Sequence, residues 1–445
     1  MNSFFHKNSI KKLLEISNTN KDYLLNISYS NYMKYENKIQ SLVKFDYKTI
    51  DLFTKKLEIN NDKRLFNIPF GIKDIFNVIN FSNEKGSVIY KNFYPGNNAR
   101  VVDKLLDCGS IPFAKTVTSE FAVHELNKTT NPYDQKKTPG TSSSGSAASV
   151  ASGYFPFALG TQTAGSIIRP SSYCNIWGFK PSFGLIPRTG VLKTTDTLDS
   201  IGFFSSNGEN IKYLLDIMRV AGKNYPYVHK NIDNKISEID SKKSNFRIGF
   251  VKTHTWESAK KYVKDSISNF VNRIDNNKNF SVDEIILPNN YDMIHKNHSN
   301  IYNKSLSYYF KNEFKNREKL LSNKITEMIE RGNLISNLDF KKSLLFQNKI
   351  ILNTNKIFKN YDAIISISTS ESAPYRNIEA LDDPSLMWTF AHMPALNIPL
   401  FRCPEGMPYG LQLTAKKWND YQLLKTLEAL FKENIIFSNP YDNSH

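Results

Sequence analysis

The sequence predicts an α/β fold in which strands and helices alternate around a sheet. From residue 67 onward, short apolar runs such as 110–116 (SIPFAKT) and 154–160 (YFPFALG) alternate with helical patterns such as 99–109 (ARVVDKLLDCG). Hydrophobic residues also make up 40% of the 445-residue chain and aromatic residues 13%, which is enough for a sizeable core. This composition excludes a disordered or low-complexity chain.

The N-terminal segment has a helical pattern of its own. Apolar residues recur at helical spacing between residue 3 and about residue 60. The positions with this spacing are Ile10, Leu13, Leu14, Ile39, Leu42 and Val43. We therefore expect a helical lead-in over residues 1–60 that packs on a core domain spanning residues 61–445.

The rest of the chain continues the alternation. Strands are expected within 246–251 (FRIGFV), 361–368 (YDAIISIS), 395–400 (ALNIPL) and 410–415 (GLQLTA), and a final helix over 419–433 with Asn419 as its N-cap. Residues 255–360 are rich in Lys and Asn and mostly helical in period. No internal repeat or Gly/Ser linker divides the chain, which favours one domain.

The charge balance bears on the class of partner. The chain has 58 Lys and Arg against 42 Asp and Glu, a net charge of +16, which would suit a polyanion or an acidic substrate. The lysines are scattered through amphipathic stretches, however, and the sequence contains no recognisable nucleic-acid-binding motif. Nucleic acid is therefore not an expected partner.

The cysteines and the N-terminus indicate the compartment. Cys108, Cys174 and Cys403 are too few and too far apart for a disulfide framework or a zinc site. Lysines interrupt the apolar runs at the N-terminus, and no later segment is apolar enough to span a bilayer. We expect a cytoplasmic protein without a membrane partner.

Two stretches concentrate small hydroxylated residues, at 138–153 (TPGTSSSGSAASVASG) and 158–184 (ALGTQTAGSIIRPSSYCNIWGFKPSFG). Apolar residues follow the first stretch at once, so it should be buried and not act as a flexible linker. Gly140 and Gly145 have the spacing of a phosphate-binding loop, but Ser146 stands where the lysine should be. The hydrolase motif GxSxG is absent as well. What remains is a dry pocket of hydroxyls, in which a turn at 161–166 (TQTAGS) could direct backbone N–H groups at an oxyanion.

Taken together, these stretches resemble the signature of the amidase signature family. Further matching pieces occur in order at 68–74 (IPFGIKD), 109–122 (GSIPFAKTVTSEFA), 130–134 (TNPYD), 198–204 (LDSIGFF), 393–400 (MPALNIPL) and 407–413 (MPYGLQL). The resemblance covers about residues 65 to 430. It implies a single α/β domain with a mixed central β-sheet flanked by helices on both faces, an amidase activity, and neither cofactor nor metal.

The resemblance also implies catalytic roles, residue by residue. Ser166 of AGSIIRP matches the nucleophile, Ser142 the bridging serine with a cis peptide bond, and Lys73 of GIKD the base. A lysine can act as a base near neutral pH only if burial lowers its pKa from about 10.4. The N–H groups of the turn would form the oxyanion hole. The oxyanion-hole residues are Thr163, Ala164 and Gly165, with Ser166 itself.

Some positions depart from the common family pattern or leave two interpretations open. Thr141 and Ala164 stand where the family usually has Gly, and whether the Thr141–Ser142 bond is cis stays open. Arg169 lies where malonamidase-like members hold a substrate carboxylate, but it could equally form a structural ion pair. Cys174 is expected to be a core residue and not a nucleophile.

The sequence therefore predicts an amidase that hydrolyses a C–N bond of a small amide, carboxylate-bearing if Arg169 faces the substrate. The first alternative is the glutamine-hydrolysing A subunit of a tRNA-dependent amidotransferase. The basic charge favours this alternative, whereas the segment 382–400 (DDPSLMWTFAHMPALNIPL) lacks the small-residue lead-in of such subunits. A second alternative is a non-catalytic interaction or RNA-binding descendant. The expected partner is a small-molecule amide, and a homodimer stays open.

Overall fold

The strands form one eleven-stranded sheet. The structure, a computed structural model, describes residues 2–56, 62–220 and 243–443. The strand order across the sheet is β1-β3-β2-β4-β6-β5-β10-β11-β9-β7-β8. In chain order the strands are β1 (Leu42–Lys44), β2 (Pro69–Lys73), β3 (Ile111–Thr116), β4 (Phe157–Gln162), β5 (Trp177–Lys180), β6 (Ser200–Ser205), β7 (Phe246–Val251), β8 (Phe280–Ile285), β9 (Ala363–Ile367), β10 (Ala395–Arg402) and β11 (Pro408–Thr414).

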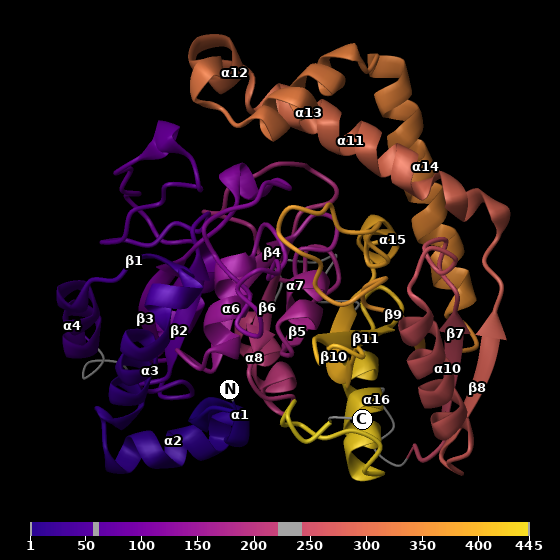
Figure 1. Ribbon diagram of the computed structural model, residues 1–445, viewed down its shortest axis with the longest axis horizontal. Coiled ribbons are helices and arrows are strands. Elements are labelled where there is room, and N and C mark those ends of the chain that lie inside the picture. Colours follow the sequence, from indigo (N-terminus) through magenta and orange to yellow (C-terminus); the bar gives the residue numbers. More distant parts are fainter. Residues whose placement is uncertain (1, 57–61, 221–242, 444–445) are drawn as a thin grey trace.

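The sheet is mixed, as the sequence predicts. Strand β2 runs parallel to β3 and β4, and β7 runs parallel to β8 and β9, whereas the other neighbours are antiparallel. Figure 1 shows the sheet crossing the body of the molecule with helices packed against it. The strands expected within 110–116, 154–160, 246–251, 361–368, 395–400 and 410–415 are all present, with ends shifted by a few residues.

Helices cover both faces of the sheet. Successive residues of β4 alternate between two apolar clusters, with Phe157 and Leu159 in one and Ala158 in the other. The first cluster contains residues of α5, α8 and α16, and the second contains residues of α6. The predicted architecture of a mixed sheet with helices on both faces is confirmed.

The helices of the described residues are α1 (Phe4–Lys7), α2 (Ile10–Thr19), α3 (Tyr23–Ile39), α4 (Tyr47–Lys56), α5 (Arg100–Asp107), α6 (Ser144–Ala151), α7 (Ile168–Tyr173), α8 (Asn210–Met218), α10 (Lys261–Asp275), α11 (Ile294–Tyr309), α12 (Lys311–Arg317), α13 (Asn323–Leu334), α14 (Asn337–Ile357), α15 (Leu386–Phe390) and α16 (Asp420–Lys432). Asn419 occupies the N-cap position of α16, as expected. None of these helices is long and apolar enough to cross a bilayer.

The N-terminal segment is helical except at its end. Helices α1 to α4 lie in this segment, but Leu42 and Val43 lie in the short strand β1 and not in a helix as their spacing predicts. Gln40 ends α3 in the left-handed conformation, with φ 52°, and the chain then pairs antiparallel with β3 at the sheet edge. Three residues are too few for their spacing to separate a strand from a helix. The domain boundary at residue 60 stays a prediction, because residues 57–61 lie outside the described part of the chain.

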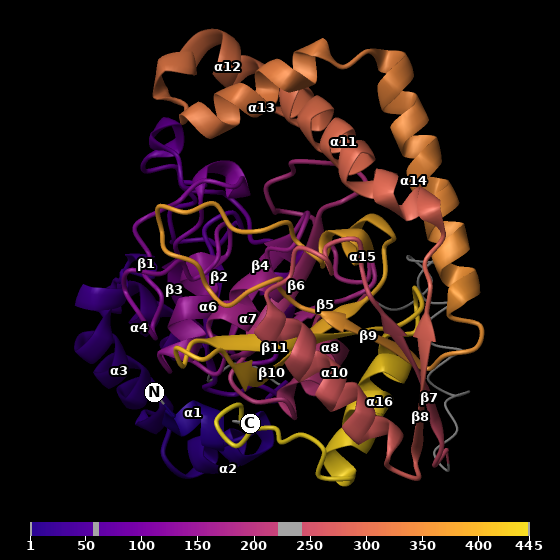
Figure 2. The same ribbon diagram turned by 45° about the vertical axis from the view of Figure 1, so that its right-hand side comes forward.

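Helices α11 to α14 form an arm above one side of the sheet (Figures 1 and 2). The helical period expected over residues 255–360 is confirmed for α10 and for this arm. Strand β8, within the same region, was not predicted. It lies at the edge of the sheet, and only Phe280 of its six residues is buried, so it has no continuous apolar run.

Candidate active site

Lys73 lies at the C-terminal end of β2, and its amine is surrounded by hydroxyl groups. Its Nζ atom lies 3.0 Å from Ser142 Oγ, 3.0 Å from Ser143 Oγ and 2.9 Å from Thr161 Oγ1. The side chain has no exposed surface. A charged ammonium would fill these contacts as three donors, whereas a neutral amine would donate two hydrogen bonds and accept one.

Burial changes the acidity of this amine. Desolvation lowers the pKa of Lys73 well below 10.5, and the more distant charge of Asp199 opposes the change to a smaller extent. The acidic residue next in sequence, Asp74, does not neutralise Lys73, because its carboxylate pairs with Lys115 at 2.9 Å. Lys73 is therefore a buried amine whose hydrogen-bond partners are all hydroxyls.

Two glycines allow the loop that carries Ser142 and Ser143 to approach Lys73. Gly140 has a φ of +92°, and a Cβ there would lie 2.7 Å from Pro170 Cβ. A Cβ on Gly145 would lie 2.3 Å from the backbone nitrogen of Val117 and 2.4 Å from the carbonyl oxygen of Ser41. Because only a residue without Cβ fits at either point, α6 begins in direct backbone contact with the edge of the sheet, and Ser142 and Ser143 are placed over β2.

The Thr141–Ser142 peptide bond is trans, like every described peptide bond. The cis geometry that the resemblance implies is therefore not seen here. A trans bond is the lower-energy form for a residue other than proline, and the Ser142 hydroxyl reaches Lys73 in this form. The Thr141 hydroxyl lies 3.3 Å from His124 Nδ1.

Ser166 lies in the turn between β4 and α7, and the carbonyl groups of this turn are held by distant side chains. His298 Nε2 lies 2.9 Å from the Thr163 carbonyl oxygen, and Thr389 Oγ1 donates to the Ala164 carbonyl at 2.7 Å. In a planar trans peptide the N–H group points away from the C=O group. Fixing these two carbonyls therefore also fixes the directions of the next two N–H groups in the turn. Ala164 has no positive φ, so its methyl group causes no left-handed strain.

The buried side chain of Gln162 also stabilises this turn through hydrogen bonds. Gln162 Oε1 accepts hydrogen bonds from the backbone N–H groups of Ile167 at 2.7 Å and Ile168 at 3.0 Å. Its Nε2 donates to Thr389 Oγ1 at 2.8 Å. The sequence motif TQTAGS contains Gln162 but predicts no role for it, and nothing in the sequence pointed to Thr389 or His298. Only the polarity of Gln162 inside an apolar strand could have pointed to it.

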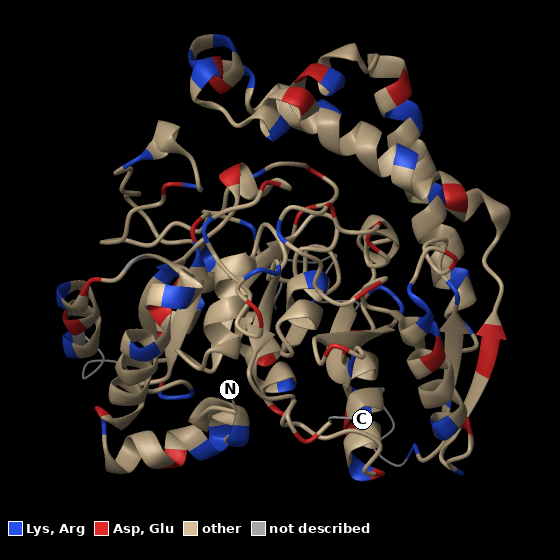
Figure 3. Ribbon diagram, in the orientation of Figure 1, with Lys and Arg blue, Asp and Glu red and all other residues tan. Residues whose placement is uncertain are grey.

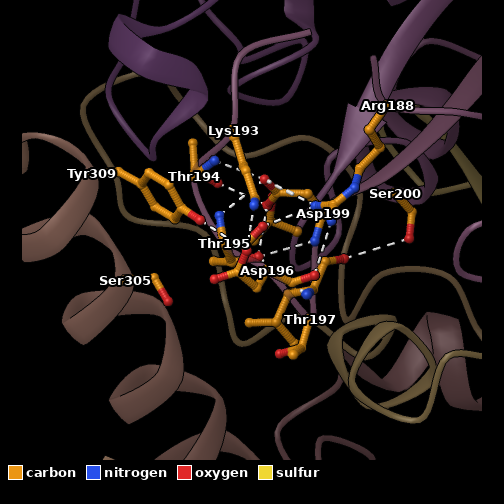
Figure 4. Close-up of polar contacts among 12 residues, drawn as sticks. Arg188, Lys193, Thr194, Thr195, Asp196, Thr197, Asp199, Ser200, Ser305 and Tyr309 are labelled. Atoms are coloured by element: carbon orange, nitrogen blue, oxygen red, sulfur yellow. Dashed lines mark hydrogen bonds and ion pairs between the residues drawn. The ribbon is translucent and has the colours of Figure 1, made fainter.

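Asp199 contacts the outer side of the turn through Thr163. Figure 4 shows Asp199 with its neighbours Thr194, Thr195 and Arg188. Thr163 Oγ1 donates to Asp199 Oδ1 at 2.9 Å, and the Thr194 and Thr195 hydroxyls donate to the same oxygen. Arg188 Nη1 lies 3.7 Å from Asp199 Oδ2. The segment around Asp199, which follows the predicted turn by more than thirty residues, therefore supports Thr163.

The structure brings two of the three predicted catalytic residues into contact. Lys73 and Ser142 are hydrogen-bonded, and both are buried. Ser166 is 5% exposed, and within the described part of the chain its hydroxyl makes no hydrogen bond to Ser142 or Lys73. Ser143 and Thr161, which sequence reasoning did not select, complete the contacts of the amine.

A pocket of about 630 Å³ opens beside the two serines. Its lining includes Thr141 and Ala164, which neighbour Ser142 and Ser166, together with Arg169 and Asp383. Arg169 Nη2 and Asp383 Oδ2 lie 3.0 Å apart, and a Cβ on Gly165 would lie 1.6 Å from the same Asp383 oxygen. Arg169 thus forms an ion pair and also lines the pocket, and its role in holding a substrate carboxylate stays a prediction. Asp383 was not predicted.

The other predicted residues have simpler environments. Cys174 is fully buried, its Sγ lies 3.7 Å from the Pro139 carbonyl oxygen, and burial raises the pKa of its thiol. The prediction that Cys174 is a core residue is confirmed. Among the described residues, no three His, Cys, Asp or Glu side chains are grouped so that they could hold a metal ion.

Comparison with known proteins gives consistent matches over nearly the whole chain. The family model described as Amidase matches residues 24–424. The A subunit of the glutamyl-tRNA(Gln) amidotransferase of Treponema denticola is 28% identical over 418 residues, covering 84% of this chain and 86% of that protein. The protein of the same name from Saccharolobus solfataricus is 28% identical over 448 residues and 92% of each chain.

Solved structures with the same fold include enzymes with different names. The A subunit of the glutamyl-tRNA(Gln) amidotransferase of Thermotoga maritima matches with a TM-score of 0.81 and 22% identity over 98% of each chain. The native peptide amidase of Stenotrophomonas maltophilia matches with a TM-score of 0.79 and 18% identity over 97% of this chain and 98% of that one. At these identities the structures show the fold alone.

The family match defines the class of protein: an enzyme that hydrolyses amide carbon–nitrogen bonds. The chain belongs to the Amidase family, the amidase signature enzymes that its motifs resemble.

Proposed function

We propose that this enzyme hydrolyses the terminal carboxamide of a small amino acid, with glutamine as the candidate substrate, and passes the released ammonia to a partner protein. The observation that carries this proposal is the pair of opposite charges, Arg169 and Asp383, in the pocket beside Ser166. The similar proteins named as A subunits of glutamyl-tRNA(Gln) amidotransferases support it as well. This proposal takes the first alternative from the sequence in preference to the uncharged small amide.

The charge pair suits a zwitterion. Arg169 Nε and Nη2 and Asp383 Oδ2 are buried without a hydrogen-bond partner, although Nη2 and Oδ2 are 3.0 Å apart, because the pair is not aligned as a hydrogen bond. A buried ion pair with unused hydrogen-bonding groups is costly unless a ligand completes it. An α-amino acid offers a carboxylate for the guanidinium and an ammonium for the carboxylate, so it would satisfy both residues together.

In the proposed acylation step, Ser166 Oγ attacks the carboxamide carbon. Its proton passes through the Ser142 hydroxyl to the neutral amine of Lys73, and the amine returns a proton to the departing nitrogen, which leaves as ammonia. The missing hydrogen bond between Ser166 and Ser142 would form when substrate positions the Ser166 side chain, since catalytic hydrogen bonds are often long without substrate. The N–H groups of Thr163, Ala164 and Gly165 would hold the oxyanion.

In the deacylation step, water attacks the acyl ester on Ser166. Lys73 accepts a proton from this water through Ser142, and Ser166 leaves with a proton as the acid is released. The net reaction converts an amide and water into a carboxylic acid and ammonia. Burial lowers the pKa of Lys73 and so favours its neutral form, which would serve both steps because the amine must accept a proton in each of them.

The test compares amides that share the reacting group and differ in charge. Ammonia release by the purified chain would be measured with glutamine and with butanamide, which has neither the carboxylate nor the ammonium. We expect a kcat/KM for glutamine at least about 100-fold higher, because two charge-assisted hydrogen bonds contribute about 1.5–3 kcal/mol each. Comparable values for the two amides would favour the uncharged small-amide hydrolase.

Variants assign the preference to the charge pair. Arg169→Gln and Asp383→Asn should each raise KM for glutamine at least about tenfold and change the kinetics with butanamide little. Lys324→Gln is the matched control, because Lys324 lines the same pocket but lies 4.0 Å from Glu327. Equal effects on both amides would mean that the pair is structural only.

Two further measurements separate the remaining alternatives. A fluorophosphonate probe should label the wild-type protein and not Ser166→Ala. Absence of label and of ammonia release would favour the non-catalytic descendant. Addition of a copurifying protein and tRNA should raise glutamine hydrolysis if ammonia is made for a partner protein.

A further inference from the structure

The outer face of α14 carries a line of exposed leucines. Leu338, Leu345 and Leu352 are 61%, 60% and 64% exposed and follow one another at intervals of seven residues. At a rise of about 1.5 Å per residue, this line extends about 21 Å along the helix. Figures 1 and 2 agree that α14 lies at the outer margin of the arm, with no described element beyond it.

Exposed lysines alternate with these leucines on the same line. Lys342 and Lys349 each follow one leucine by four residues and precede the next by three, which places them on the same face of the helix. Lys356 continues the series after Leu352, and all three lysines are exposed. Figure 3 shows Lys and Arg among the charged positions of the arm. The opposite face of α14 is buried through Ser343, Gln347, Ile350 and Thr354.

The pattern is that of one half of a helix–helix contact. A single exposed leucine is ordinary on a protein surface, but three in a straight line form a strip of apolar side chains, here with lysines between them. A spacing of seven residues keeps the strip on one side of the helix, as in the contact between two coiled-coil helices. Polar residues between the leucines would then select the partner by charge.

We propose that this face of α14, through Leu338, Leu345 and Leu352 with Lys342 and Lys349, binds an acidic amphipathic helix of a partner protein. The partner helix presents apolar residues to the leucines and carboxylates to the lysines. A second copy of this chain does not fit, because its lysines would face lysines and each copy carries a net charge of +16.

A lipid surface fits the strip less well than a helix does. A helix that lies on a membrane has a wide apolar face with lysines along its margins. Here the lysines lie between the leucines, and the remaining faces of α14 lie against the protein or are polar. Binding to anionic vesicles is therefore an outcome that the experiment has to exclude.

Residues of the arm also contact the segments around the candidate active site. A partner bound to α14 would therefore be linked to that site through these contacts. Gln347 of α14 donates to the carbonyl oxygens of Thr197 at 3.2 Å and Phe390 at 3.1 Å. His298 of α11 contacts the Thr163 carbonyl oxygen in the turn before Ser166. The docking proposal does not rest on the proposed substrate, because its test measures binding and not hydrolysis.

The experiment uses a synthetic 21-residue helical peptide with leucine at every seventh position and glutamate between the leucines on the same face. Its binding to the full chain would be measured by fluorescence anisotropy. Two control peptides have lysine in place of glutamate or a scrambled order of the same residues. The glutamate peptide should bind at least tenfold more tightly than either control, and added salt should weaken it.

Protein variants place the binding on α14. Leu345→Glu, and the double variant Lys342→Glu with Lys349→Glu, should each weaken binding of the glutamate peptide at least tenfold. The double variant should also bind the lysine peptide more tightly than wild type does. Ile286→Glu and Lys278→Glu change an exposed aliphatic residue and an exposed lysine outside α14, and they should leave binding unchanged. Thermal unfolding of every variant checks that the fold is retained.

Three results would overturn the proposal. The first is no binding of the glutamate peptide, or equal binding of the lysine peptide. The second is a concentration-dependent dimer of the chain alone that Leu345→Glu abolishes, which would assign the strip to a second copy. The third is binding to phosphatidylserine-containing vesicles that the same variant abolishes, which would assign the strip to a membrane surface.

Discussion

Two buried lysines on neighbouring strands have opposite surroundings. Lys73 on β2 contacts three hydroxyl groups, whereas Lys115 on β3 contacts the Asp74 carboxylate at 2.9 Å and two backbone carbonyls. Burial lowers the pKa of both amines, but for Lys115 the Asp74 charge opposes this change directly. Burial alone therefore does not make a lysine a base.

The difference shows how the fold gives the proposed catalytic amine and the structural amine different partners. The two lysines lie one position apart in register on parallel strands, since Lys73 pairs with Thr116 and Ile72 with Lys115. Asp74 follows Lys73 in sequence but points to Lys115. The carboxylate that could have kept Lys73 charged is thus used by its neighbour, and Lys73 keeps only neutral partners.

The largest expected effect is the loss of catalysis when the first lysine is replaced. Lys73→Met removes the proposed base and should lower kcat/KM for ammonia release at least about 10³-fold, a magnitude within the range of general-base contributions. Thermal unfolding should change little or shift upward, because a buried amine is replaced by an apolar side chain of similar size. Lys115→Met should not produce a comparable loss of kcat in the folded enzyme. Equal losses in the two variants would contradict the assignment of Lys73 as base and Lys115 as a structural residue.

The second expected effect falls on stability. Lys115→Met leaves the Asp74 carboxylate buried without its partner, and removing one member of a buried pair costs about 3–5 kcal/mol of the free energy of unfolding. Urea unfolding monitored by circular dichroism measures this loss. Adding Asp74→Asn to the variant should recover part of the lost stability. A single variant as stable as wild type would mean that the pair is not needed.

The third expected effect concerns the turn before Ser166. His298→Phe and Gln162→Leu remove side chains that fix the turn and should lower kcat about 10- to 100-fold, less than the loss of an oxyanion donor itself. KM should change little, since neither residue lies on the substrate side of the turn. His298→Asn, which can still donate a hydrogen bond, should recover part of kcat. An unchanged kcat in all three variants would contradict this positioning role.

The smallest expected effect is a dependence on pH. Because the folded pKa of Lys73 is lowered from 10.5, the unfolded chain binds more protons between the two values. The contribution of Lys73 to the free energy of unfolding therefore rises with pH across this window, and kcat/KM is lost as the pH falls through the lowered pKa. Lys73→Met should remove this part of the stability slope, which urea unfolding at several pH values measures. An identical slope in the variant would argue against a neutral Lys73.

The sequence was informative where residues close in the chain carry the signal. The motif around Lys73 and the small-residue stretch with Ser142 gave the contact between them, and the alternation of strands and helices gave the mixed fold. Strand β1 was predicted as helix and β8 was missed, because one has three residues and the other is mostly exposed. Neither segment has enough alternating buried residues to be identified as a strand from its sequence.

The supporting residues could not be predicted because their contacts are distant in sequence. Asp383 meets Arg169 across more than two hundred residues, and His298 and Thr389 reach the turn before Ser166 from α11 and α15. Nothing in the local pattern around these residues separates them from ordinary polar residues of a helix or loop.

The most direct test of a neutral Lys73 is its titration in the folded enzyme. The ¹³Cε resonance of Lys73 would be recorded against pH in protein labelled at lysine, and assigned by its absence in Lys73→Met. We predict a resonance typical of an uncharged amine at neutral pH, which changes only as the pH falls well below 10.5. A resonance that stays that of a charged ammonium up to about pH 10 would contradict the account.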